Sequence, residues 1–486
     1  MTMPLPIVGL LAPWAVAAAL AAAVRPYRAI VGWLTVALSL VSLAFAAAIW
    51  RLALSGPGSV GGPGDLFRAD ALSAFIAGCI ALVAALSMWL GPGLSGDEEG
   101  PGAGKFRAHG SLFVLSMLAA VTVNNVALMW VAIEATTITS ALLIPLHRSK
   151  ASVEASWKYL LIGSVGIALA FAGTVLAYFD FVTILGRRGD ALDWSLLMSV
   201  APSLHPDVLR LAFVFLVVGY GTKAGLAPMH TWLPDAHSEA PAALSALMSG
   251  VLLAVAQYAI LRWKAVVDLA AGPGFSTEVL VLLGLCSVAV GALSLVPQRN
   301  YKRMLAYSSV EHSGLICLGL AFGPAGVFAS MLHVLNHALA KSTAFLMAGR
   351  VLRRYGSADV DDVSGLLQTM PGTAVVFASG LLALMGLPPF GLFVSEFLLF
   401  RAGFLSGHVW TTAAAMLLAG IGFVAIAARL PGMLYGAPPA SVASGEGRAW
   451  MLTPVFLGLA GLVALGLVLP ASVGGLIDRI VGSLGT

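Results

Sequence analysis

The stretch LAFVFLVVGYGTKAGLAPMHTWLP, Leu211–Pro234, is an apolar run interrupted by a lysine, three glycines and two prolines. Crossing a bilayer as a helix takes about twenty residues, so the run predicts a membrane span. Lys223 lies inside it, and Gly225 and Pro228 follow. Proline removes a backbone donor and glycine loosens a helix, which predicts a break at membrane depth. Such backbone is tolerated only where it is buried in protein or lines water, so we expect a polar interior around this lysine.

A second stretch, GLPPFGLFVSEF at Gly386–Phe397, repeats this pattern of glycines and prolines next to a charged residue, Glu396. It predicts a second broken span. The two broken spans are the seventh and the twelfth of the predicted set, so they lie five spans apart. Paired broken helices in corresponding positions indicate inverted repeats. An offset of five reverses the topology, so spans four to eight and nine to thirteen are expected to be inverted copies.

The composition of the whole chain supports a multi-span membrane protein. Of 486 residues, 59% are hydrophobic and 10% are charged, whereas a soluble domain carries about 25% charged residues. A transmembrane barrel is excluded because its strands would alternate in hydrophobicity. The net charge is +4 and there is no long basic tract, which argues against nucleic acid as a partner. The three cysteines, Cys79, Cys286 and Cys317, lie inside apolar runs and are expected to be packing residues.

The apolar runs predict an all-α polytopic protein of about fourteen helices, the run at 374–405 counting as one interrupted span. They lie at 5–24, 29–50, 71–90, 111–123, 126–146, 157–178, 211–227, 242–261, 279–297, 304–322, 326–349, 374–405, 409–430 and 452–469. The first run is expected to be a retained span rather than a cleaved signal, because Arg25 and Arg28 follow it. The piece Ala471–Leu484 is too polar to span and is expected along the surface.

These spans divide the chain into four predicted parts. An N-terminal three-helix segment occupies 1–110 and the first five-helix repeat 111–265. The second, inverted repeat occupies 266–430, and a C-terminal helix and surface tail occupy 431–486.

The basic residues predict the orientation of the spans, because cytoplasmic loops are enriched in Lys and Arg. With the N-terminus outside, fifteen of the 26 basic residues fall in inner loops, Arg107 among them. Nine fall in outer segments, including Arg262 and Lys264, and Lys223 and Lys341 remain within spans. Both termini are therefore predicted to face outside.

Several ionisable residues lie within the predicted spans, where each charge costs about 2.5–3.5 kcal/mol at the bilayer centre. They are Glu134, Lys223, Glu311, His312, Lys341 and Glu396. One or two could simply join helices as buried ion pairs. Because such pairs rarely repay their desolvation, the whole set favours a pathway for ions.

Two further features are less specific. His333, His337 and Lys341 recur every four residues, which places them on one helix face over about 12 Å; a relay and plain packing both fit this stripe. The segment after Lys223 contains His230, Asp235, His237 and Glu239. It could hold a metal, cap a helix or form a proton-entry mouth.

Five stretches resemble the antiporter-like, proton-translocating membrane subunits of the respiratory complex I superfamily. They are IEATTITSALL (133–143), GTKAGLAPMHTWLPDAHSEAPAALSALMSG (221–250), RMLAYSSVEHSG (303–314), HALAKSTAFLMAG (337–349) and GLPPFGLFVSEF (386–397). The resemblance runs from about Ser111 to Leu430. The forms YSSVEHSG and NHALAKS are most similar to the membrane subunits of [NiFe]-hydrogenase and formate-hydrogenlyase complexes. The family fold has fourteen helices with two inverted five-helix repeats and two broken helices.

The resemblance implies a role for particular residues. Glu134 and Lys223 would form an ion pair, and Lys341 with His333 and His337 would form a central relay. Glu396 would be the exit group, with His230, His237, Glu311 and His312 as secondary candidates for the proton path. Where several relatives carry a lysine in span eight, this sequence has Ala254; Gln257, Tyr258 or water would have to compensate.

The implied function is proton translocation within a redox-driven complex of the membrane-bound hydrogenase or NADH:quinone oxidoreductase type. No cofactor or metal is expected in this chain. Partner membrane subunits and a peripheral redox arm would carry iron–sulfur and nickel–iron or flavin centres. The alternatives are a sodium/proton antiporter subunit, a proton-coupled membrane partner of an inorganic-carbon uptake complex, and a structural scaffold. The expected location is a bacterial or archaeal cytoplasmic membrane.

Overall fold

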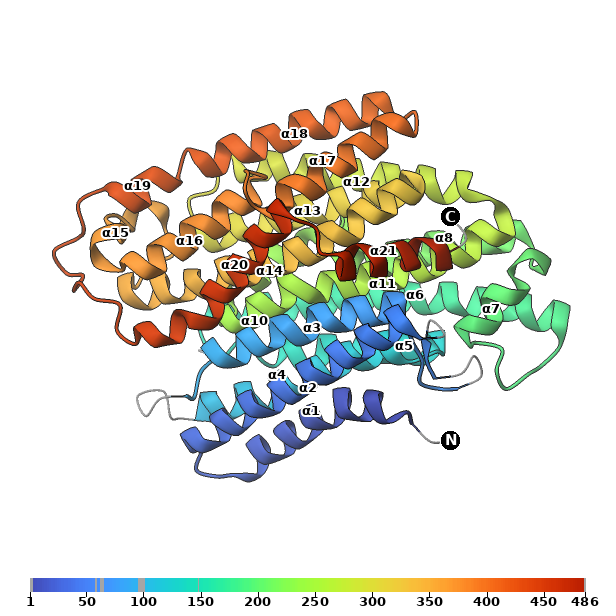
Figure 1. Cartoon of the computed structure of the whole chain (residues 1–486), viewed down its shortest axis with the longest axis horizontal. Coiled ribbons are helices and arrows are strands. Elements are labelled where there is room, and N and C mark those ends of the chain that lie inside the picture. Colours follow the sequence, from blue (N-terminus) through green and yellow to red (C-terminus); the bar gives the residue numbers. More distant parts are fainter. Residues whose placement is uncertain (1–2, 57–58, 62–64, 95–100, 147, 485–486) are drawn as a thin grey trace.

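The computed structural model describes residues 3–56, 59–61, 65–94, 101–146 and 148–484. The described chain is a bundle of long helices that run roughly side by side (Figure 1). In this part of the chain, nine helical stretches are long and apolar enough to cross a membrane. Helices that carry buried charges, such as α13 (Tyr301–Ala321) and α14 (Gly323–Tyr355), fall outside those nine. A polytopic α-helical protein is confirmed, and the total of fourteen spans stays a prediction.

The first three helices pack at one side of the bundle, and a two-stranded antiparallel hairpin connects the second of them to the third. They are α1 (Leu5–Ala23), α2 (Ala29–Ser55) and α3 (Ala71–Leu90), with β1 (Ser59–Val60) and β2 (Ala69–Asp70) between α2 and α3. Arg107 closes the end of α3. Its guanidinium donates to the carbonyls of Met88 (2.7 Å), Gly91 (3.0 Å) and Pro92 (2.9 Å). These are carbonyls that a helix end leaves without partners, so Arg107 is fully buried rather than a loop residue as predicted.

The first group of central helices runs from Pro101 to Ala271. It contains α4 (Pro101–Thr122), α5 (Val126–Ala141), α6 (Lys150–Leu185), α7 (Trp194–Val200), η2 (Ala201–Ser203), α8 (Pro206–Ala224), η3 (Met229–Thr231), α9 (Trp232–Glu239), α10 (Ala242–Leu247), η4 (Met248–Leu252) and α11 (Leu253–Ala271). Here η4 is one wide π turn that joins α10 to α11.

The second group contains α12 (Pro273–Leu295), α13, α14, η5 (Val360–Asp362), α15 (Leu366–Thr369), α16 (Pro371–Leu384), α17 (Gly391–Leu405), α18 (Val409–Ala427) and α19 (Leu430–Tyr435). The chain ends with η6 (Ala449–Leu452), α20 (Thr453–Leu467) and α21 (Ala471–Ser483). Helix α21 buries Leu476, Ile477 and Ile480 against α2, α3 and α14. The start of α1 and the end of α21 lie toward the same end of the bundle (Figure 1).

In each group, one helix begins at an asparagine that both caps the helix and forms a β-bridge with a distant aspartate. Asn125 caps α5 and forms a β-bridge with Asp193, just before α7. Asn300 caps α13 and forms a β-bridge with Asp359, just before η5. Helices α7 and α15, which follow these bridges, lie at opposite ends of the bundle (Figure 1). The same local construction at opposite ends supports the inverted relation between the two groups.

Both predicted breaks are present, and each is made at a glycine. Helix α8 ends at Gly225 (φ 72°), and the chain turns into η3 and α9. Helix α16 ends just before Gly386 (φ 65°), and α17 begins at Gly391. A positive φ is the left-handed conformation that only glycine adopts without strain. The two breaks therefore depend on these glycines as well as on the prolines that follow.

Two predicted loop residues are instead buried within α11, which extends ten residues beyond the predicted span. Arg262 forms two 2.7 Å hydrogen bonds with the carboxylate of Asp70, and Lys264 contacts Asp268. The nearby carboxylates keep both cations paired inside the protein. The predicted span ended too early because it was drawn from apolar residues alone.

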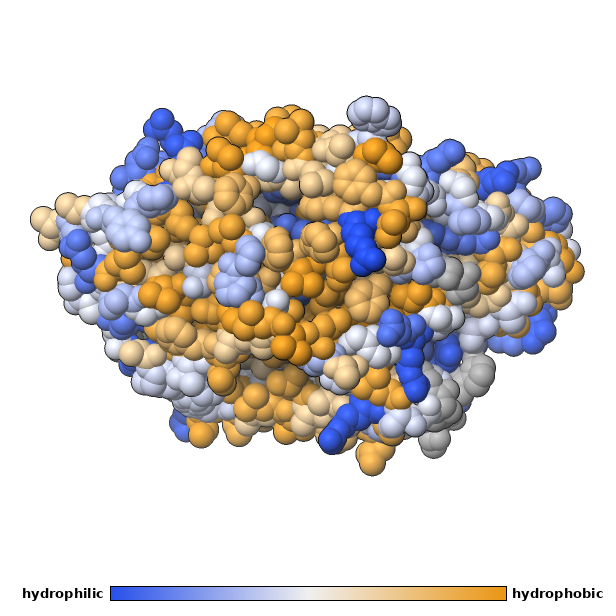
Figure 2. Space-filling view, turned by 45° about the horizontal axis from the view of Figure 1, so that its top comes forward, coloured by the Kyte–Doolittle hydropathy of each residue, from blue (hydrophilic) through white to orange (hydrophobic). Residues whose placement is uncertain are grey.

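The surface of the described chain fits a lipid environment. Large apolar side chains such as Leu161 and Val165 on α6, and Leu417 and Val424 on α18, are exposed. Figure 2 shows a broad apolar band across the molecule, with hydrophilic residues gathered toward its two ends and a hollow with a hydrophilic floor in the band. Cys286 is exposed on α12, so it is not the buried packing residue expected, whereas Cys79 and Cys317 are buried.

Candidate functional site

The first cluster surrounds Lys223, in the last turn of α8 before the break at Gly225. Its side chain is buried, with 1% of the residue exposed. The ammonium donates hydrogen bonds to Thr137 Oγ1 (2.7 Å) and Tyr159 Oη (2.8 Å). It also lies 4.7 Å from the centre of the Tyr159 ring, within the range of a cation–π contact. Helices α5 and α6 thus supply the groups that hold this lysine.

Glu134 joins the same cluster from α5. Its carboxylate accepts hydrogen bonds from Thr137 Oγ1 (3.1 Å) and Ser164 Oγ (2.9 Å). Thr137 therefore accepts from Lys223 and donates to Glu134 through one hydroxyl. The expected ion pair is replaced by a bridged arrangement of carboxylate, hydroxyl and ammonium.

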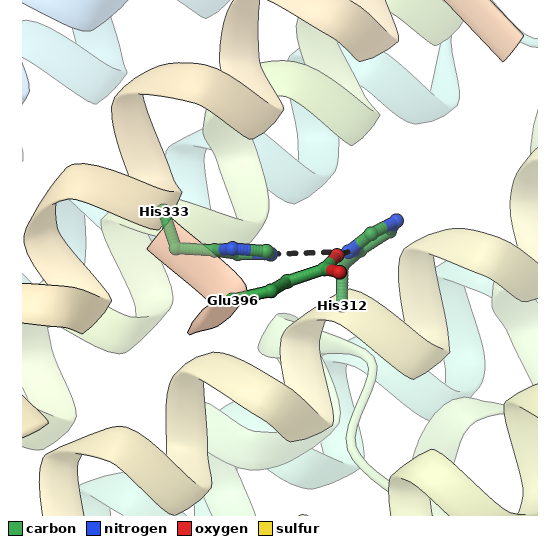
Figure 3. A group of neighbouring side chains, drawn as sticks. All are labelled: His312, His333 and Glu396. Carbon is green, nitrogen blue, oxygen red and sulfur yellow. Dashed lines mark hydrogen bonds and ion pairs between the residues drawn. The ribbon is translucent and has the colours of Figure 1, made fainter. Parts of the chain in front are cut away.

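A second cluster lies where α13 and α14 meet the break between α16 and α17. Figure 3 shows His312, His333 and Glu396 converging from three different helices. His312 Nδ1 lies 3.0 Å from His333 Nε2 and 3.8 Å from Glu396 Oε1. A Cβ at Gly386 would lie 2.2 Å from Glu396 Oε2. Gly386 therefore both turns the chain and leaves room for this carboxylate.

The predicted stripe on α14 is confirmed as a buried row. His333, His337 and Lys341 are 0–4% exposed. The His337 ring centre lies 5.2 Å from that of His312, and Lys341 donates to Leu305 O (2.7 Å) and contacts Ser308 Oγ on α13. The row and the second cluster are thus one continuous group of ionisable side chains.

The two clusters approach each other across α11. Ser313 Oγ donates to Ala224 O (2.6 Å), next to Lys223, and accepts from Gln257 Nε2 (2.9 Å). Gln257, Ser313 and His337 line one narrow interior gap together with Ala254. Gln257 Oε1 and His337 Nε2 have no hydrogen-bond partner among the described residues. The gap lies at the position where the resemblance implies a lysine.

The remaining predicted residues flank these clusters. Glu311 is 6% exposed, and its carboxylate lies against Gly422, where a Cβ would be 2.6 Å from Oε1. His237 is buried in α9 with its ring stacked on Phe345, and neither ring nitrogen has a partner in the described part of the chain. His230 is half-buried in η3. Neither histidine lies in the group of potential metal ligands that the described residues form.

Several hydroxyl residues that contact these clusters were not predicted from the sequence. Thr137 and Tyr159 hold Lys223, Ser164 holds Glu134, and Ser395 contacts His333 Nδ1 at 3.0 Å. Thr137 could have been found, because residues three apart share a helix face and Glu134 precedes it by three. The others lie far from their partners in sequence, and serine, threonine and tyrosine are common in apolar runs.

The arrangement offers proton donors and acceptors in a row. Lysine, histidine and carboxylate side chains exchange protons, and hydroxyl groups connect them. They lie within a membrane protein, next to two helix breaks whose free backbone groups are tolerated only in a buried or hydrated interior. This chemistry suits the transfer of a small cation.

The comparisons with known proteins agree with this geometry. A family model described as "NADH:quinone oxidoreductase/Mrp antiporter, TM" matches residues 123–422. The hydrogenase-4 component F homolog of Methylacidiphilum infernorum is 44% identical over 291 residues, which are 58% of this chain and 59% of that relative. NADH-quinone oxidoreductase subunit N of Desulforudis audaxviator is 33% identical over 356 residues, 71% of this chain and 68% of that protein.

A chain of the membrane-bound sulfane sulfur reductase, an archaeal respiratory membrane complex, has the same fold with a TM-score of 0.88. It is 22% identical, and the match covers 98% of this chain and 97% of that one. The family match includes both helix breaks and every residue of the two clusters. The chain belongs to the NADH:quinone oxidoreductase/Mrp antiporter family of membrane proteins.

Proposed function

We propose that this chain is a proton-translocating membrane subunit of a multisubunit, redox-driven complex of the hydrogenase or NADH:quinone oxidoreductase type. The observation that carries the proposal is the bridged group of Glu134, Thr137 and Lys223 beside the break in α8. A buried ammonium held by two hydroxyls exchanges its proton without first breaking a direct ion pair.

The proposed path runs from Lys223 to the row on α14 and then to Glu396. Lys223 would release its proton when its interaction with Glu134 weakens. The proton would cross the gap lined by Gln257 and His337 and reach His312, His333 and Glu396. Moving one charge against 100 mV requires about 2.3 kcal/mol. A change in a few hydrogen bonds to charged groups, each contributing about 1.5–3 kcal/mol, is large enough to gate this step.

The driving energy would come from partner subunits, in which the iron–sulfur and nickel–iron or flavin centres would lie. The complex would reside in a bacterial or archaeal cytoplasmic membrane, with both termini of this chain on the outer side. The two predicted repeats, 111–265 and 266–430, would each contribute one broken helix and one cluster to the path.

Sodium/proton antiport is the second candidate, and the Mrp antiporters within the matching family favour it. The chemistry of the second cluster argues for protons, because hard cations prefer oxygen ligands and two of its three groups are imidazoles. Transport that needs sodium in the medium would support the antiporter.

The test measures proton uptake by inverted membrane vesicles while the complex runs its own electron-transfer reaction. Lys223→Ala and Lys223→Arg are both expected to abolish proton uptake, because alanine carries no proton and an arginine guanidinium does not release one. Lys158→Ala removes an exposed lysine of α6 and serves as the matched control. Wild-type proton uptake in an assembled Lys223→Ala complex would refute the proposal.

A further inference from the structure

The hydrogen bonds around His312 define which of its nitrogens carries a proton. Nε2 lies 3.2 Å from the carbonyl oxygen of Leu384. A carbonyl can only accept, so Nε2 must donate. In the neutral ring, Nδ1 therefore presents its lone pair toward His333.

The contacts of His333 allow two arrangements. Its Nδ1 lies 3.0 Å from Ser395 Oγ, and that hydroxyl lies 3.0 Å from Leu392 O. When Ser395 accepts from Nδ1–H, Nε2 of His333 presents a lone pair, and two lone pairs then face each other across 3.0 Å between His312 and His333. When the Ser395 hydroxyl donates to Nδ1 instead, Nε2–H of His333 donates to His312 Nδ1. The first arrangement is the one that binds a cation between the two rings.

The carboxylate of Glu396 completes a set of three ligands. The three ligand atoms lie within 4.8 Å of one another, and Figure 3 shows Glu396 pointing toward the two rings. Zinc binds histidine nitrogens and carboxylate oxygens at about 2.0–2.2 Å, so ligand atoms around one ion are about 3–4 Å apart. The separations of 3.0 and 3.8 Å from His312 Nδ1 fit this range.

The outer hydrogen bonds are also those of a metal site. A histidine that binds a metal usually donates its other N–H to a carbonyl, a carboxylate or water, which fixes the tautomer. Here His312 donates to Leu384 O, and His333 Nδ1 lies beside Ser395 Oγ, which contacts Leu392 O. With His333 donating to Ser395, both rings present a nitrogen lone pair to the ion.

We infer that His312, His333 and Glu396 form a binding site for one divalent transition metal ion of the zinc class. The ion would lie between the two rings. Glu396 is the ligand nearest the surface of the chain, with 15% of its side chain exposed, so it would meet the ion first. Blockage of proton transfer by the bound ion rests on the proposed function, whereas binding itself does not.

The test adds Co²⁺ and then Zn²⁺ to the complex, which is purified by an affinity tag on the full-length chain. We expect one Co²⁺ to bind per chain, with the visible absorption of a tetrahedral or five-coordinate site. Added Zn²⁺ is expected to displace this Co²⁺. His312→Gln and His333→Gln are each expected to remove this absorption. Ser395→Ala keeps all three ligands but loses the hydroxyl that fixes His333, so Co²⁺ should bind about 10–100-fold more weakly. His408→Gln is the matched control, because His408 lies outside the cluster, next to Ser406 and Phe322.

A Co²⁺ spectrum that is unchanged in His312→Gln and His333→Gln would overturn the inference, as would absence of the spectrum in the wild type. In either case the two rings share a proton instead. Inhibition of proton uptake by Zn²⁺ is measured separately in the vesicles. Cobalt binding without this inhibition would support the metal site and count against the proposed path through it. Loss of proton uptake in Lys223→Ala without any cobalt binding would support the path and refute the metal site.

Discussion

Removal of the Thr137 hydroxyl separates the two charged groups of the first cluster. Thr137→Val keeps the shape of the side chain and deletes the hydrogen bond to Glu134 (3.1 Å) and the one from Lys223 (2.7 Å). A hydrogen bond to a charged group contributes about 1.5–3 kcal/mol. Lys223 keeps Tyr159 and Glu134 keeps Ser164, so we take one such bond as the net loss. Since about 1.4 kcal/mol is a factor of ten, proton uptake should fall about ten- to one-hundred-fold.

The assay compares initial rates of proton uptake by inverted vesicles, normalised to the amount of assembled complex. Thr136→Val is the matched control, because the neighbouring hydroxyl donates to the carbonyl of Ile133 in its own helix, 2.5 Å away. Thr137→Ser retains a hydroxyl and should restore most of the rate. Equal rates in Thr137→Val and Thr136→Val would refute the bridging role of Thr137.

Four further predictions concern contacts outside this bridge. Arg262→Met removes two 2.7 Å hydrogen bonds from the buried carboxylate of Asp70, which keeps only Arg68 at 3.8 Å and the Ser73 N–H. Thermal unfolding of the purified complex should therefore show a loss of up to about 3–5 kcal/mol, and an unchanged melting curve would contradict this. Burial alone would raise the pKa of Asp70, but the charge and hydrogen bonds of Arg262 hold that pKa well below its usual range. The stabilisation is therefore complete above the ordinary pKa of about 4 and is lost as pH falls through the lower folded value, and Asp70→Asn should flatten this acid dependence of the melting temperature. Lys302→Met removes a side chain that donates to two carbonyls at the end of α9, so hydrogen exchange in residues 232–240 should speed up, while equal protection would exclude this capping role. Gly422→Val places a side chain where the carboxylate of Glu311 lies, so proton uptake should fall if that carboxylate acts in the path, and Gly420→Val, at an open position, is the control.

The broken helices were predictable because each one combines several local signals. Lys223 with Gly225 and Pro228, and Glu396 with its glycines and prolines, concentrate a costly charge and helix-breaking residues in one place. Both breaks are present in the structure. The stripe of His333, His337 and Lys341 was predictable because helical periodicity alone places these side chains on one face.

The partners of these residues were not predictable from the sequence. Arg262 was placed in a loop because a charge normally ends an apolar run, yet Asp70, far away in the chain, pairs with it inside the bundle. Tyr159 lies 64 residues from Lys223 and carries no signal beyond an aromatic residue in an apolar helix. Such pairings depend on which helices become neighbours, and a pattern within one segment carries no information about that.

The π turn η4 determines which side chains of α10 and α11 share one face of the helix. A π turn takes up one residue more than an α turn, and one residue of an α-helix corresponds to about 100° of rotation. The 3.6-residue periodicity of Ala242–Leu247 therefore does not carry over to Ala254 and Gln257, which lie beyond the turn. Removing a single residue from Met248–Leu252 would change the π turn into an ordinary α turn and leave α10 and α11 facing the same neighbours. A related chain that is one residue shorter here would therefore keep the same face toward His337, but an ungapped alignment with it would pair residues from different faces.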